Sequence, residues 1–194
     1  RKWQGYKLRY SFVGFLDFDY TSVTHPKVLD FVASEDEFLY FLKNISAAHG
    51  GNDVAEDLFE GLEAGGKCSW RSFIKICFIV TDAMCHGSDF HSKKSCDSHY
   101  NRVGCDKKEC ARLLNVFKQK GVRNLFFIHI DDDTTQMESV LQQLWVDAEK
   151  GYSFQVGNLA SDTSKFLQFV VQSVSQSVQI QSVFNVAFES EGKL

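Results

Sequence analysis

The stretch that decides the expected fold runs from Cys68 to Gly87 and reads C-S-W-R-S-F-I-K-I-C-F-I-V-T-D-A-M-C-H-G. Its middle part, Ile74 to Thr81, is almost entirely β-branched or aromatic, which is typical of a central parallel strand buried on both faces. Asp82 follows this strand directly. Because ligands of open α/β sheets lie outside the carboxyl ends of the strands, Asp82 is a candidate site residue. The alternative is that it only begins a turn.

Downstream of this strand, helical and strand patterns alternate. The expected elements are a helix from Asp106 to Lys120, a strand from Asn124 to Ile130, a helix from Thr134 to Ala148, a strand from Tyr152 to Val156 and a helix from Ser161 to Ile180. This alternation predicts an α/β fold in three layers, with a doubly wound, mostly parallel sheet covered by helices on both faces. Residues 1–181 are expected to form the domain, and residues 182–194 a C-terminal tail or an edge strand.

Upstream, an antiparallel edge is predicted. The expected elements are strands from Leu8 to Phe18 and from Val28 to Val32, and a helix from Glu35 to Ala48 that Ser34 caps. Asp53 is expected to begin a further helix, because Glu56 follows it at the spacing of a capping box. Capping alone would explain Asp53.

Composition excludes several classes of partner. The chain has 194 residues, a net charge of −4 and no long basic run, so nucleic-acid binding is not expected. No apolar stretch approaches the roughly 20 residues that span a bilayer. Cys77 lies inside the predicted buried strand, and such cysteine usage favours a reduced, cytoplasmic setting. Since the chain begins at Arg1 rather than Met, we expect it to be part of a larger polypeptide.

Five short motifs together resemble the von Willebrand factor A domain, in the branch associated with alpha-kinases of the Dictyostelium type. They are F-V-G-F-L-D at Phe12 to Asp17, G-G-N-D-V-A-E-D at Gly50 to Asp57, E-G-L-E-A at Glu60 to Ala64, W-R-S at Trp70 to Ser72 and D-A-M-C-H-G at Asp82 to Gly87. His91 also matches a common histidine of this branch. The resemblance implies a non-catalytic domain that binds a protein partner at the carboxyl ends of its strands, with help from a divalent cation.

The resemblance also implies roles for individual residues. Asp82 and Asp53 would contact the ion. Because their ligand atoms are oxygens, the expected ion is Mg²⁺ or Mn²⁺. The partner-binding residues would be Asp17, Asn52, His86 and His91.

The chain departs from the family where the ion should bind. The family's Asp-x-Ser-x-Ser loop and the strand before it are not found, so the fold would be truncated at its N-terminus and the ion site incomplete. Asn52 and Asp53 also stand where many members place a metal-contacting Thr. The alternative is therefore a degenerate scaffold domain that binds no metal inside a larger protein or assembly.

The segment from Cys85 to Cys110 contains four cysteines and three histidines. Cys96-x2-His99 and Cys105-x4-Cys110 approach zinc-ligand spacings, and an enzyme using zinc here is a third hypothesis. Zinc is not the expectation, because the family turn already accounts for His86 and His91. A disulfide from Cys105 to Cys96 or Cys110 is a further alternative. No nucleophile–base signature is present, so the chain is not predicted to be an enzyme.

Overall fold

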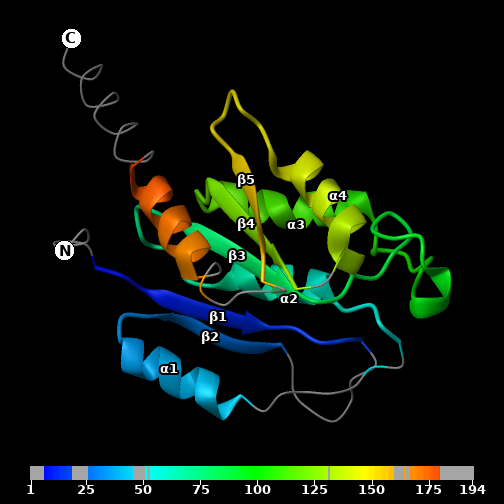
Figure 1. Cartoon of the computed structure of the whole chain (residues 1–194), viewed down its shortest axis with the longest axis horizontal. Helices are drawn as coiled ribbons and strands as arrows, with labels where there is room; N and C mark the ends of the chain where they lie inside the picture. Colours follow the sequence, from blue (N-terminus) through cyan, green and yellow to red (C-terminus); the bar gives the residue numbers. More distant parts are fainter. Residues whose placement is uncertain are drawn as a thin grey trace. The chain divides into compact units, whose positions relative to one another are not determined.

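The computed structural model describes residues 7–18, 26–45, 51, 53–130, 132–159, 164 and 167–179. The chain divides into two compact units. The first unit comprises Arg1–Ser72 and Met84–Lys120, and the second comprises Phe73–Ala83 and Gly121–Leu194. A two-stranded antiparallel sheet lies in the first unit and a three-stranded parallel sheet in the second, so the predicted α/β class is confirmed (Figure 1).

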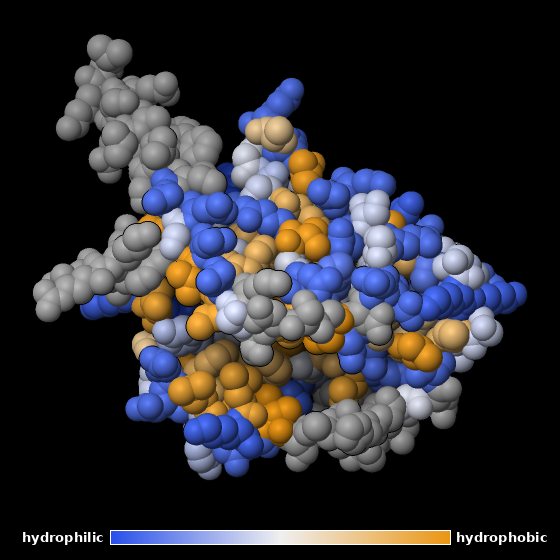
Figure 2. Space-filling view, in the orientation of Figure 1, coloured by the Kyte–Doolittle hydropathy of each residue, from blue (hydrophilic) through white to orange (hydrophobic). Residues whose placement is uncertain are grey.

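The first unit begins with the predicted hairpin. Strands β1 (Tyr10–Gly14) and β2 (Lys27–Val32) pair in antiparallel fashion. Helix α1 (Glu35–Asn44) follows, and the Ser34 hydroxyl accepts the Glu37 amide as the sequence predicted. No side chain of α1 is fully buried, and Figure 2 shows apolar side chains gathered on the surface over α1 and the hairpin.

Helix α2 (Leu58–Lys67) starts five residues later than predicted. Its N-cap is Asp57, whose side chain accepts the Glu60 amide, so the predicted cap at Asp53 is wrong. The sequence holds two successive pairs with capping-box spacing, Asp53/Glu56 and Asp57/Glu60. The later start is favoured because Leu58, Phe59 and Leu62 are then buried on one helix face. Val54, expected on that face, is half exposed.

Helix α3 (Lys107–Gln119) completes the first unit and packs on α2. Asp106 caps it, as the predicted boundary requires. Between His86 and α3 the chain is irregular except for the short 3-10 helix η1 (Lys94–Cys96). This long loop is nevertheless part of the core, because Phe90 is fully buried and its ring lies 5.6 Å from that of Phe59.

The second unit contains strands β3 (Ile76–Thr81), β4 (Asn124–His129) and β5 (Ser153–Asn158), all parallel, in the order β3-β4-β5. The prediction that β3 is central and buried on both faces is wrong for the described sheet. There β3 pairs on one side only, and Val80 is 42% exposed. The central strand is β4, whose residues are buried except for the last.

Helices complete the second unit. The 3-10 helix η2 (Asp132–Thr134) leads into α4 (Thr135–Trp145), and residues 167–179 are also helical. Phe169 from that last helix packs edge-on against Phe126 of β4, with ring centroids 5.9 Å apart. The predicted tail, residues 182–194, lies outside the described residues.

Among the described residues, the strands belong to a two-stranded and a three-stranded sheet, and no pairing joins the two. A single three-layer, doubly wound sheet therefore remains a prediction. Within the described parts of the chain, no helix combines the length and the apolar composition needed to cross a bilayer.

Two glycines of the long loop test how tightly it is packed. Gly87 and Gly104 both have positive φ, at 108° and 90°. A Cβ at Gly87 would collide with the Cys105 carbonyl, whereas a Cβ at Gly104 would meet nothing within 4 Å. We expect Gly104→Ala to lose roughly 1 kcal/mol of unfolding free energy and Gly87→Ala about 3 kcal/mol or more, measured by urea denaturation. Equal losses would show that the loop is not packed as described.

Candidate metal centre

Three side chains from separate parts of the first unit converge on one point. Asp17 lies three residues after β1, Asp53 in the turn before α2, and His86 at the start of the long loop. One ligand atom from each lies within 4.8 Å of the others. Carboxylate and imidazole groups at this spacing can hold a metal ion.

Asp17 supplies an oxygen that needs a partner. The residue is 1% exposed, and among the described residues its Oδ2 has no hydrogen-bond partner. Gly51 lies beside this oxygen, and a Cβ there would collide with it. A buried carboxylate oxygen without a partner costs free energy, which a cation in this place would recover.

His86 lies between two carboxylates. Its Nε2 is 2.9 Å from Asp17 Oδ1, and its Nδ1 is 2.7 Å from Asp97 Oδ1. The imidazole is completely buried, and the Phe18 ring stacks on it with centroids 4.7 Å apart. The Arg102 guanidinium lies over the Phe18 ring at 3.9 Å. The two carboxylates therefore hold the nitrogens of the His86 ring, and the Phe18 ring packs against its face.

Asp97 fixes the donor pattern of the whole cluster. Its Oδ1 accepts from His86 Nδ1 at 2.7 Å and from the His99 amide at 2.7 Å. Its Oδ2 accepts from the Gly87 amide at 2.9 Å and from His91 Nε2 at 3.0 Å. Burial raises the pKa of this carboxyl, but the hydrogen bonds from His86, Gly87 and His99 outweigh burial, so the pKa lies below its ordinary value.

An ionised Asp97 determines which atoms of the histidines are protonated. A carboxylate only accepts hydrogen bonds, so His86 Nδ1 and His91 Nε2 both carry hydrogens and donate. His86 Nε2 is then the ring nitrogen that faces Asp17 and can bind a metal.

Asp53 is held in place by backbone amides. Its Oδ1 accepts the Ala55 amide at 3.0 Å, which is an Asx turn, and its Oδ2 accepts the Ser98 amide at 2.6 Å. These contacts link the turn before α2 to the long loop. Asp53 is only partly buried, so the site opens to solvent on its side.

The structure distributes the predicted site residues differently from the expectation. Asp53 belongs to the ligand group, but Asp82 lies in the second unit directly after β3 and is not a member. Asp17 is a candidate ligand, whereas a partner-binding role had been predicted for it. His86 and His91, which the resemblance assigned to partner binding, are buried. Asn52 lies outside the described residues.

Asp97 is the member of this hydrogen-bonded cluster that the sequence patterns did not single out. It lies in an irregular loop without periodicity, and its four donors come from positions up to 11 residues away. The available signal is the density of His and Asp in this loop, whereas the zinc hypothesis used only the Cys and His spacings.

The cysteines do not provide the site. All six are free thiols. Burial raises the pKa of Cys105 to about 11, that of Cys110 to about 12, and that of Cys85 well above its ordinary value. These thiols are neutral at physiological pH, and no cysteine belongs to a group of three ligands in the part of the chain that the structure describes.

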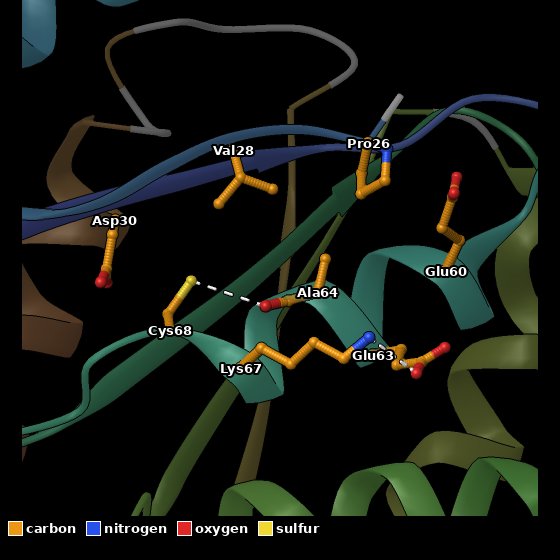
Figure 3. Close-up of a pocket in the computed structure, with 8 residues that line it drawn as sticks. All are labelled: Pro26, Val28, Asp30, Glu60, Glu63, Ala64, Lys67 and Cys68. Carbon is orange, nitrogen blue, oxygen red and sulfur yellow. Dashed lines mark hydrogen bonds and ion pairs between the residues drawn. The ribbon is translucent and has the colours of Figure 1, made fainter. Parts of the chain in front are cut away.

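A separate cavity of about 410 Å³ lies between the hairpin and α2. Its lining, drawn in Figure 3, comprises Pro26, Val28, Asp30, Glu60, Glu63, Ala64, Lys67 and Cys68. Lys67 pairs with Glu63 at 2.8 Å, and burial raises the pKa of the Cys68 thiol. The cavity thus presents a neutral thiol and an ion-paired lysine beside the acidic side chains of Asp30, Glu60 and Glu63.

Comparisons with known proteins do not add a family to this picture. No protein-family model matches the chain, and neither a curated protein nor a solved structure matches it. The functional argument therefore depends on the residues and on their geometry.

The cap of α2 gives a pH-dependent prediction. Burial is the largest cause that raises the pKa of Asp57 from 3.8 to about 6. The folded state then binds more protons than the unfolded state between these values, so stability falls as pH rises through that window, by about 3 kcal/mol at most. Asp57→Asn keeps a capping oxygen but does not titrate. In urea denaturation, the unfolding free energy of the variant should increase relative to that of the parent as the pH is raised from 4 to 7. A difference that is constant with pH would contradict this.

Proposed function

We propose that this chain is a non-catalytic protein-interaction domain of the von Willebrand A type, whose loops are held in their binding shape by a divalent cation. One observation carries the proposal. Asp17, Asp53 and His86 come from three of the five motifs that resemble the family, and their ligand atoms converge. Three motifs that are far apart in the sequence thus contribute to one site, which is expected if they serve the same function.

The cation would act as a cross-link. Asp17 and His86 are 69 residues apart in sequence, and an ion between them and Asp53 would join the end of β1, the turn before α2 and the long loop. Two apolar side chains project to solvent from these segments, Val54 beside Asp53 and Val103 beside Arg102, the latter 95% exposed. Apolar groups of this kind are what protein partners bury.

The buried groups do not favour catalysis. His86 and His91 are both buried and donate to Asp97, and these hydrogen bonds hold the loop together. The neutral thiols of Cys85, Cys105 and Cys110 are poor nucleophiles. These features support a binding role over an enzymatic one.

A scaffold domain without metal is the second candidate. The hydrogen bonds of His86 to both carboxylates already connect the same segments. In that case an ion would add little stability, and removing it would change neither the conformation of the loop nor the binding of a partner.

Proteins that copurify with the chain from cells provide the test of the interaction role. We expect EDTA treatment, Val54→Asp and Val103→Asp each to reduce the same set of partners more than tenfold. Tyr40→Asp is the matched control, because Tyr40 of α1 is 72% exposed and lies outside the three ligand segments. If EDTA and the two loop variants leave every partner bound, the proposed face is wrong. Loss with the loop variants but not with EDTA would favour the scaffold.

A further inference from the structure

We infer that Asp17, Asp53 and His86 form a centre for a transition-metal ion of the zinc type, in which Asp97 is the positioning residue. The inference rests on the cation binding of the proposed function and goes beyond it. It assigns the class of metal, the role of Asp97 and the purpose of the ion.

The first argument is the carboxylate behind the imidazole. A histidine that binds a metal through one nitrogen typically donates its other N–H to a carboxylate, which sets the tautomer and the ring orientation. Asp97 Oδ1 accepts from His86 Nδ1 at 2.7 Å, so Nε2 is presented to Asp17 and Asp53. Asp97 is itself fixed by three further donors.

The second argument is the ligand chemistry. Mg²⁺ and Ca²⁺ prefer sites made only of oxygen ligands, whereas imidazole favours zinc and its transition-metal neighbours. One imidazole and two carboxylates form such a mixed set, and the two negative charges balance a divalent ion. In the metal-free chain His86 Nε2 lies 2.9 Å from Asp17 Oδ1, and the ion would take the place of this contact.

The third argument is enclosure. Asp17 and His86 are both at most 1% exposed, and the Phe18 ring covers the imidazole. Only Asp53 is partly exposed to solvent. An ion in such a place stabilises the loop from within and is not presented to a partner's carboxylate. The metal is therefore structural.

The test uses the full chain, stripped with chelator and titrated calorimetrically with ZnCl₂, CoCl₂ or MgCl₂ alone. We expect one equivalent of Zn²⁺ to bind at least 100-fold more tightly than Mg²⁺. Asp17→Asn should weaken Zn²⁺ binding more than tenfold while preserving volume. Asp97→Asn should weaken it 10- to 100-fold and shift the visible spectrum of the Co²⁺ form, as expected for a reoriented ligand. Asp89→Asn is the control, because Asp89 accepts the Lys107 amide outside the ligand group and should leave affinity unchanged.

Equal affinity for Mg²⁺ and Zn²⁺, or an unchanged Zn²⁺ affinity in Asp17→Asn, would overturn the inference. X-ray absorption spectroscopy of the zinc-loaded parent is an independent test, because it does not depend on whether the variants fold. It should show nitrogen and oxygen ligands, and sulfur ligands would place the ion among the cysteines instead. The two proposals fail separately. A zinc centre with partners that resist both EDTA and the two loop variants would overturn only the proposed interaction face, and partners that need Mg²⁺ without a zinc centre would overturn only this inference.

Discussion

The carboxylate of Asp97 is buried, and the loop from His86 to Cys105 depends on how its charge is compensated. An ionised carboxylate away from water is stable only when its oxygens are fully hydrogen-bonded. Two backbone amides and two histidines supply four donors, from Gly87, His86, His91 and His99. These donors fold a segment with little regular structure around a single group. That explains how an irregular loop can have a buried core that includes Phe90.

The same hydrogen bonds prepare the candidate metal centre. Once Asp97 holds Nδ1–H of His86, the opposite nitrogen faces Asp17, and stacking by Phe18 keeps the ring there. The Ser98 amide holds Asp53 in turn. The ligands are therefore positioned by contacts that exist before any ion binds, which lowers the entropy cost of forming the site. Fold stability and the proposed cation binding thus depend on one set of interactions in this unit.

Sequence patterns predicted local structure well where the signal is local. The parallel strand character of β3 and β4, the α1 cap at Ser34 and the α3 boundary at Asp106 all follow from nearby residues. Two predictions failed because local patterns do not report long-range packing. Asp53 and Asp57 have equal capping spacings, and only the burial of Leu58 and Phe59 decides between them. Likewise β3 and β4 are both apolar, and pairing alone makes β4 central.

The sequence singled out the individual residues of the candidate site, but it did not predict that they lie together. Asp17, Asp53 and His86 each stand in a motif that attracted attention, yet nothing in the sequence states that they meet. Asp97 has no motif, since its role arises from donors that only the folded loop brings together.

The most direct measurement is the protonation pattern of His86, read from long-range ¹H–¹⁵N NMR spectra of the metal-free chain and assigned by comparison with His86→Gln. The account predicts a protonated Nδ1 whose hydrogen exchanges slowly and resonates far downfield, because it is buried against the Asp97 carboxylate. It also predicts that Zn²⁺ changes the Nε2 resonance while Nδ1 stays protonated. An unprotonated Nδ1 would contradict this, since Asp97 would then be the donor and would not direct Nε2 toward the ion.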